Sequence, residues 1–135
     1  MPILTVLISG GPAAGRDASV ADALAQLTAD VLRKDRRLTS VAIAHVPDAQ
    51  WIVGGAALDA QRRTSFFVDV RVTARTNSRE EKARYIAAVF ARMRDLLGIP
   101  HEASYVHVHE VPADAWGYGG LTQAQRQGAR LAAAA

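Results

Sequence analysis

The amino-acid sequence predicts an α/β (α+β) fold. Two tandem βαβ units form a four-stranded sheet with two helices on one face, and a C-terminal tail helix follows. Three observations lead to this prediction. A strand–turn segment recurs at a fixed offset, two stretches carry apolar residues at helical spacing, and short apolar runs are rich in branched side chains. A chain of 135 residues with 50% hydrophobic residues can form one domain with a core.

The repeated segment sets the architecture. Residues 41–55 and 106–120 align without a gap at an offset of 65 residues, and they share Val, Val-Pro, Trp and Gly-Gly. Both tryptophans of the chain, Trp51 and Trp116, fall inside this match. A fixed period of this length indicates a duplicated supersecondary unit.

The first unit contains a strand, a helix and a second strand. Residues 2–9 form a short apolar run that ends at two glycines, which predicts a buried strand. Residues 17–34 carry apolar side chains at helical spacing and end in two basic residues, which predicts a helix. We expect the second strand over residues 38–46, a turn or short hairpin over residues 47–55 and a polar connection over residues 56–64.

The second unit repeats this order. Residues 66–73 predict a strand, and Ser78 with Glu81 has the spacing of a capping box at a helix start. The helical pattern continues to Leu97 and stops at Gly98. Residues 104–111 predict the fourth strand. We therefore predict a single domain over residues 1–135, with repeat one at about 1–60, repeat two at about 61–120 and a helical tail over 121–135.

The order of elements also predicts the sheet and an assembly. A strand–helix–strand unit requires a right-handed crossover, which makes its two strands parallel and places both helices on one face. The other face is then uncovered, and we expect it to carry Leu, Ile, Val and Phe side chains. An exposed apolar sheet of this size requires a partner. We expect a homo-oligomer whose sheets face each other.

Charge and composition exclude several classes of protein. The formal net charge is +3, but the basic residues are scattered among 13 acidic ones, and aromatic residues make up only 6%. A nucleic-acid surface normally has clustered cations or stacking aromatics, so we expect no nucleic-acid partner. The sequence has no cysteine for disulfides and no apolar run near the roughly 20 residues of a membrane span. Its start lacks a signal peptide, so we expect a cytoplasmic protein with no membrane partner.

Several motifs together resemble the tautomerase superfamily. They are Met1-Pro2 before an apolar strand, Leu-Thr-Ser-Val at residues 38–41, and the Trp and Gly-Gly turns of both units. The last two are similar to 4-oxalocrotonate tautomerase, a member with a single βαβ unit. The tandem arrangement resembles malonate semialdehyde decarboxylase and cis-3-chloroacrylic acid dehalogenase. The resemblance implies a trimeric isomerase that acts on small oxo-acids and uses an N-terminal proline exposed by removal of the initiator Met.

Pro2 is the residue to which the resemblance assigns the chemistry. Terminal amines titrate near pH ~8 in model peptides, and apolar surroundings or nearby cations lower their pKa. A neutral amine can take a proton from carbon beside a carbonyl, and the protonated amine can act as a general acid. The alternative is that Pro2 only begins a strand, where proline is tolerated. At the repeat offset Pro2 lies opposite Phe67, which has no free amine, so we expect one such site per chain.

Other candidate site residues follow from the same resemblance. Arg75, after the third strand, matches an arginine that binds the substrate carboxylate in the decarboxylase. Arg16 lies near the first helix, as does a substrate-binding arginine of the single-unit tautomerase, although a solvated loop charge is an equal alternative. Arginines beside helix N-termini suit carboxylates. Asp35 matches an aspartate that precedes the second strand of the decarboxylase. We assign catalytic roles to Pro2, Arg75 and Asp35.

Substrate binding is assigned to Arg16, His107, Trp116 and Tyr118. Trp116 and Tyr118 match an aromatic pair near the decarboxylase pocket and can keep the proline amine neutral by walling it with apolar surface. His107 corresponds to a tyrosine of the dehalogenase. It shares a strand face with His109, whereas Glu110 points the other way, so three ligands do not converge and we expect no metal and no cofactor.

Departures from the family pattern limit the reaction. Ala42 replaces an arginine of the single-unit tautomerase, and Gly117 replaces the water-activating glutamate of the dehalogenase, which disfavours dehalogenation. We predict a tautomerase that interconverts keto and enol forms of a small carboxylate substrate. Decarboxylation or hydration with the same proline is the alternative reaction. A non-catalytic trimeric binding module is the alternative to an enzyme, because a fold does not fix a function.

Overall fold

Two βαβ units build one mixed sheet in the computed structural model, which describes residues 2–134. Met1 and Ala135 lie outside the described residues, and so does the expected removal of Met1. The elements of the first unit are β1 (Ile3–Ser9), α1 (Ala14–Leu32), η1 (Arg36–Leu38), β2 (Ser40–Val46), η2 (Asp48–Gln50), β3 (Ile52–Val53), β4 (Ala56–Ala57) and α2 (Leu58–Gln61). Those that follow are β5 (Phe66–Thr73), α3 (Arg79–Leu97), β6 (Tyr105–Val111), β7 (Gly117–Tyr118), β8 (Leu121–Thr122) and α4 (Gln123–Ala134).

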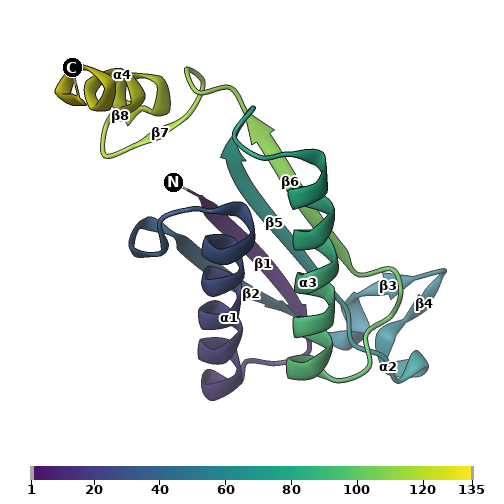
Figure 1. Ribbon diagram of the computed structural model, residues 1–135. Helices are drawn as coiled ribbons and strands as arrows, with labels where there is room; N and C mark the ends of the chain where they lie inside the picture. The colour runs from purple at the N-terminus through teal and green to yellow at the C-terminus, as the bar shows by residue number, and fades with distance from the viewer. Residues whose placement is uncertain (1, 135) are drawn as a thin grey trace.

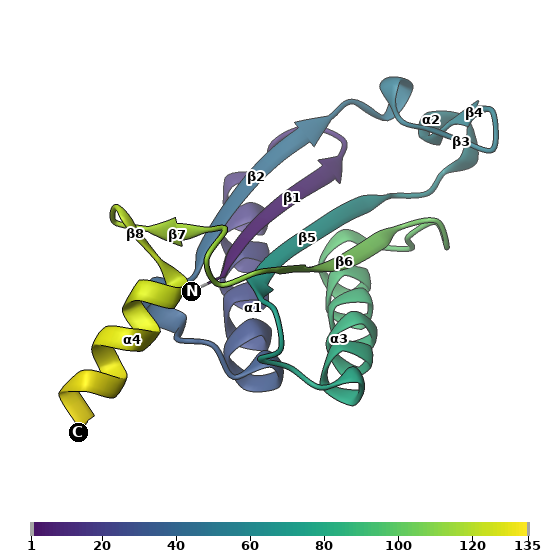
Figure 2. The ribbon, with the colours of Figure 1, turned by 90° about the horizontal axis from the view of Figure 1, so that it is seen from above.

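The sheet has the strand order β2-β1-β5-β6. β1 pairs with β2 in parallel, β5 pairs with β6 in parallel, and the two units join through the antiparallel pair β1 and β5. Figures 1 and 2 show α1 and α3 side by side on one face of the sheet, with no helix over the other face. The predicted fold class is therefore confirmed. No helix in the described part of the chain is both long and apolar enough to cross a membrane.

The core lies between the sheet and its two helices. Alternate residues of β1 and β5 point to the helices and are fully buried, as period-two alternation in a strand requires. Where α1 meets α3, the buried Thr28 hydroxyl donates to the Leu24 carbonyl oxygen at 2.7 Å, so the Tyr85 hydroxyl is the donor in its 2.9 Å bond to Thr28. The buried core side chains of the strands and helices are Leu4, Val6, Ile8, Val20, Leu24, Leu32, Phe66, Val68, Val70, Val72, Tyr85, Val89 and Met93.

The open face of the sheet is more polar than the sequence analysis expected. Ile3 and Tyr105 are exposed there, but the same alternation puts Asp69, Arg71 and His107 on that face. The expectation of a face covered by Leu, Ile, Val and Phe is therefore wrong in part, because β5 and β6 alternate apolar residues toward the helices with charged or imidazole residues toward the open side.

The repeat is visible as paired hydrogen bonds. The backbone N–H of Leu58 donates to the Trp51 carbonyl oxygen at 3.0 Å, and Gln123 N–H donates to the Trp116 oxygen at 2.9 Å. Each Trp precedes a hairpin, β3–β4 or β7–β8, whose turn is the Gly-Gly pair. Residues 56–64, expected as a polar connection, in fact contain β4 and α2. The turn or short hairpin expected over residues 47–55 is a hairpin, but its second strand lies after the Gly-Gly pair and therefore falls in the expected connection.

The register of the strands corrects the expected counterpart of Pro2. Ile3 pairs with Ser40, and Phe67 pairs with Tyr105, which is the repeat equivalent of Ser40. Phe67 therefore corresponds to Ile3, and Phe66 corresponds to Pro2. The difference of one residue arises because the loop from β5 to α3 is one residue longer than the loop from β1 to α1.

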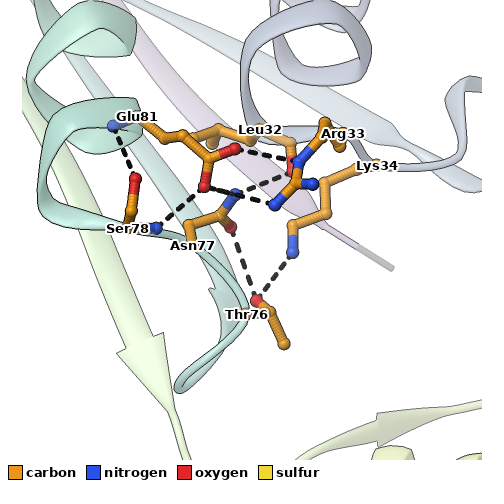
Figure 3. A network of polar contacts seen from close by, with 7 residues as sticks. All are labelled: Leu32, Arg33, Lys34, Thr76, Asn77, Ser78 and Glu81. Atoms are coloured by element: carbon orange, nitrogen blue, oxygen red, sulfur yellow. Dashed lines mark hydrogen bonds and ion pairs between the residues drawn. The ribbon is translucent and has the colours of Figure 1, made fainter.

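A polar network ties the end of α1 to the start of α3 (Figure 3). Ser78 and Glu81 form the predicted capping box, with the Glu81 N–H donating to Ser78 Oγ at 3.1 Å and the Ser78 N–H donating to Glu81 Oε1 at 2.8 Å. Arg33 at the end of α1 forms an ion pair with Glu81 at 2.8 Å, and Asn77 Nδ2 donates to the Leu32 carbonyl oxygen at 2.9 Å. These contacts fix the two helices in register.

Each hairpin lies by the strand start of the other unit. β7–β8 and the beginning of α4 lie beside the start of β1, and β3–β4 with α2 lies at the opposite end of the sheet, by the start of β5 (Figures 1 and 2). The N-terminal proline therefore meets the hairpin of the second unit.

Candidate active site

A cavity of about 350 Å³ opens beside Pro2. Pro2 is buried at the start of β1, where its carbonyl oxygen accepts a hydrogen bond from Ser40 N–H at 3.2 Å. This volume is within the range of roughly 300–1,000 Å³ that is usual for small-molecule sites. The lining combines the first unit with the second: Pro2, Ile3, Arg37, Leu38, Thr39, Ser40, Trp116, Gly117, Tyr118 and Gln123.

Trp116 and Tyr118 form the aromatic wall of this cavity. The Trp116 indole Nε1 donates a hydrogen bond to Thr73 Oγ1 at 3.2 Å, which anchors the ring at the end of β5. The guanidinium of Arg126 lies 3.8 Å from the centre of the Tyr118 ring and donates to the Tyr118 carbonyl oxygen at 2.8 Å. Three contacts, one from Thr73 and two from Arg126, therefore hold the aromatic pair beside Pro2.

Arg37 supplies the cation of the cavity. Its side chain is 89% exposed and forms an ion pair with Asp35 at 3.4 Å. Asp35 caps η1 by accepting the Arg37 backbone N–H at 2.9 Å, and the side-chain hydrogen bond from Arg37, followed by this backbone bond, lowers the pKa of Asp35. Asp35 does not line the cavity. It is an ionised carboxylate that orients Arg37.

Gln123 is a buried polar side chain of the same cavity. It is only 4% exposed, and its Nε2 has no hydrogen-bond partner among the described residues. Buried polar groups are nearly always paired, and leaving one unpaired costs about 1–3 kcal/mol. The Gln123 carboxamide therefore has a hydrogen-bond donor to offer to a molecule in the cavity.

Gly117, at the start of β7, has no room for an acidic side chain. A Cβ atom at this position would lie 1.9 Å from the Leu121 carbonyl oxygen, so any side chain would displace β8. The sequence analysis disfavoured dehalogenation because a glutamate is missing here, and the backbone geometry gives a physical reason for the glycine.

Arg75 and Arg16 do not line the cavity. Arg75 follows the C-terminal end of β5, at the end of the sheet where β1 begins. Its backbone is left-handed, with φ 65°. The other described non-glycine residues with positive φ are Arg33 and Arg62, and both end a helix. Arg16 lies at the opposite end of the sheet, after the C-terminal end of β1, where its Nη2 donates to the Gly11 carbonyl oxygen at 3.0 Å.

His107 lies on the open face of the sheet and also outside the cavity. Its ring is stacked on His109 with the ring centres 5.1 Å apart, and one ligand atom each of His107, His109 and Asp69 lies within 4.8 Å of the others. Asp69 is the converging carboxylate that the sequence analysis did not consider, whereas Glu110 binds Lys82 at 2.7 Å on the other face.

The sequence analysis missed Arg37 and Gln123. Arg37 directly precedes the Leu-Thr-Ser-Val motif, and its position before a strand beside Pro2 was a usable signal. Gln123 is the repeat equivalent of Leu58. A comparison of the two units therefore shows a polar side chain in the second unit where the first has an apolar one, and this difference was a usable signal. Of the predicted site residues, the structure brings together Pro2, Trp116 and Tyr118.

Comparisons with known proteins agree with the fold. The family model described as Tautomerase enzyme matches residues 67–126. No curated protein sequence matches the chain significantly. A solved structure described as a fused 4-OT wild type asymmetric trimer is 21% identical, covers 92% of this chain and 98% of its own, and has a TM-score of 0.80.

Two further structures have the same architecture. Pt0534 inactivated by 2-oxo-3-pentynoate is 15% identical, with 92% of this chain and 98% of its own covered and a TM-score of 0.79. A macrophage migration inhibitory factor-like protein from Entamoeba histolytica is 15% identical, with 90% and 97% covered and a TM-score of 0.74. The chain therefore has the fold of these tautomerase structures, and the Tautomerase enzyme family model matches its second unit.

Proposed function

We propose that this chain is an isomerase that interconverts the keto and enol forms of small oxo-acids, with the Pro2 nitrogen as general base and general acid. The observation that carries the proposal is the burial of Pro2 in the wall of a cavity that has one aromatic side and one cation. The family match and the fold support the same class of reaction.

The surroundings of Pro2 suit proton transfer. Removal of Met1 would turn the Pro2 nitrogen into a secondary amine. Burial of Pro2 disfavours the protonated amine, and the Arg37 guanidinium acts in the same direction although its partner Asp35 opposes it. Burial is therefore the main effect that favours the neutral base. The amine takes a proton from the carbon beside the carbonyl, and the protonated amine returns it to the oxygen of the resulting enolate.

The substrate carboxylate is assigned to Arg37. An arginine binds a carboxylate with two hydrogen bonds in a fixed plane, which orients the rest of the molecule toward Pro2. Asp35 has a positioning role in this proposal, because it holds the Arg37 side chain. Arg75 remains the second candidate for binding the substrate carboxylate, since it lies at the same end of the sheet as Pro2 and has a left-handed backbone conformation.

We propose a homotrimer as the assembly. Several structures with this fold are described as trimers, and the open face of the sheet exposes Ile3 and Tyr105. Light scattering coupled to size exclusion should give three times the mass of one chain. A monomer at micromolar concentration would contradict the assembly without affecting the assignment of Pro2.

The decisive experiment is the ketonisation of phenylenolpyruvate by wild type and Pro2→Ala. We expect a loss of at least about a hundredfold in kcat/KM, the contribution of a positioned general base. Pro12→Ala in the exposed loop after β1 is the matched control and should retain full activity. Intact mass must first show that Met1 is absent. Full activity of Pro2→Ala would refute the proposal.

Covalent labelling provides a second, independent test. Pt0534 is described as inactivated by 2-oxo-3-pentynoate. A neutral Pro2 amine should add to the alkyne of this reagent, and the mass should increase by that of the whole reagent because addition expels nothing. Peptide mapping should place the adduct on Pro2. Direct assays with malonate semialdehyde and with an acetylenic acid would detect the alternative decarboxylase or hydratase activity. A chain that binds oxo-acids without turnover would be the binding module.

A further inference from the structure

The two units place unlike side chains at one equivalent position. Leu58 and Gln123 each follow a Trp-containing hairpin, and their backbone N–H groups make the same hydrogen bond to the preceding tryptophan. Leu58 is 0% exposed and Gln123 is 4% exposed. The site by the internal strand start is therefore filled with hydrocarbon, whereas the site by Pro2 holds a carboxamide.

We propose that the Gln123 carboxamide binds the substrate oxygen that changes between ketone and enol hydroxyl. This inference rests on the proposed function and specifies its substrate class. The substrate carries a carboxylate for Arg37 and an oxo oxygen for Gln123, with the carbon that exchanges its proton close to Pro2. Small 2-oxo acids have these groups on adjacent carbons.

A carboxamide suits an oxygen that changes its hydrogen-bonding character. The ketone oxygen can only accept a hydrogen bond, whereas the enol hydroxyl can also donate one. A carboxamide offers two N–H donors and an acceptor oxygen, and half a turn about its last bond exchanges them. Gln123 can therefore pair with either tautomer, while a charged side chain at this position would favour only one.

A structural role does not account for Gln123. Its Nε2 makes no hydrogen bond within residues 2–134, so it does not tie α4 to the sheet. The equivalent Leu58 shows that the fold accepts a fully buried aliphatic side chain after the hairpin. An unpaired buried amide destabilises the protein without ligand, and a ligand oxygen would remove that destabilisation.

The test uses Gln123→Leu, which is the substitution the chain itself carries in its first unit. We expect an unchanged or higher Tm, because a buried unpaired polar group is replaced by hydrocarbon of similar size. We expect kcat/KM for phenylenolpyruvate to fall by about tenfold or more, the usual value of a hydrogen bond to a buried group. The mirror variant Leu58→Gln should instead lower Tm by roughly a few degrees and leave turnover by the correctly folded protein unchanged.

A binding measurement separates this inference from the proposed function. Calorimetry compares phenylpyruvate with 3-phenylpropanoate, which has the same carbon skeleton without the oxo oxygen. Wild type should prefer phenylpyruvate by about tenfold, and Gln123→Leu should bind both alike. Wild-type kcat/KM in Gln123→Leu, or no preference between the two acids in wild type, would overturn the inference. Loss of activity in Pro2→Ala together with either of these results would leave the proposed function standing and remove only the role of Gln123.

Discussion

The Trp116 indole donates a hydrogen bond to Thr73 across 43 residues of sequence, and this bond joins the hairpin of the second unit to the end of β5 beside Pro2. Thr73 is 7% exposed, so the bond is shielded from water. The indole is therefore a structural support for the wall of the proposed site as well as part of that wall.

Removing this one N–H should affect both stability and activity. Trp116→Phe keeps an aromatic ring but loses the donor, so we expect the free energy of unfolding to fall by about 1 kcal/mol. The hairpin should also become less well positioned, which lowers kcat/KM. Urea unfolding and steady-state kinetics measure the two effects. Trp51→Phe is the matched control, because no hydrogen bond from the Trp51 indole is found within residues 2–134; equal effects of both variants would contradict the prediction.

Arg37→Gln should raise KM for oxo-acid substrates by about tenfold, since a charge-assisted hydrogen bond to the carboxylate is lost. Arg36→Gln is the control. Arg36 is the neighbouring arginine, but it forms an ion pair with Asp22 and does not line the cavity beside Pro2. Arg75→Gln decides between the two candidates. A larger rise in KM for Arg75→Gln than for Arg37→Gln would show that Arg75, and not Arg37, binds the substrate carboxylate.

The contact between Tyr85 and Thr28 should make stability depend on alkaline pH. Burial raises the pKa of Tyr85 from 10.0 to about 12, against a smaller opposing effect of the Thr28 hydrogen bond. The unfolded chain releases this proton first, so the stabilising contribution is complete below pH 10 and is lost as pH rises toward about 12. Urea unfolding at about pH 9 and about pH 11 should show the loss in wild type and a smaller loss in Tyr85→Phe.

The pair Tyr85 and Thr28 also predicts which of two variants is less stable at neutral pH. Tyr85→Phe removes a donor but leaves Thr28 bonded to Leu24, which should cost about 0.5–1.5 kcal/mol. Thr28→Val leaves the Tyr85 hydroxyl buried and unpaired, which should cost about 1–3 kcal/mol. A larger loss in Tyr85→Phe would mean that the ring packs poorly without its hydroxyl, contrary to this account.

Zinc should not bind tightly at Asp69, His107 and His109. Donor atoms of a tetrahedral zinc site lie about 3.3 Å apart, whereas His107 Nδ1 and Asp69 Oδ2 are 3.9 Å apart. Arg71, which pairs with His109 across the open face, adds an unfavourable positive charge. Calorimetry with zinc sulfate should give no saturable binding at micromolar concentration. Binding of one zinc per chain that is lost in Asp69→Asn and in His107→Gln would contradict this.

Local patterns predicted the main strands and helices because each depends on near neighbours in sequence. The Ser78–Glu81 capping box is an example, since both partners lie within one helical turn. The contact between Gln123 and the surroundings of Pro2 depends instead on the hairpin of one unit reaching the strand start of the other. No local period encodes such a crossing.

Asp35 illustrates the same limit for side-chain roles. Asp35 precedes β2, as the sequence predicts, but its partner is Arg37, two residues away. The short helix η1 turns this pair so that the arginine lines the cavity and the carboxylate does not. Sequence spacing alone does not distinguish a carboxylate that faces a ligand from one that holds a neighbouring side chain.

Equivalent positions of the two units carry opposite pairs of side chains. Asp17 Oδ2 lies 3.0 Å from His45 Nε2 in the first unit, and at the equivalent positions Lys82 binds Glu110 at 2.7 Å in the second. Each pair lies wholly within its own unit. Placing an aspartate at position 82 would bring it against Glu110, and two neighbouring carboxylates repel each other. The two positions of a pair must therefore change together for one unit to acquire the pair of the other.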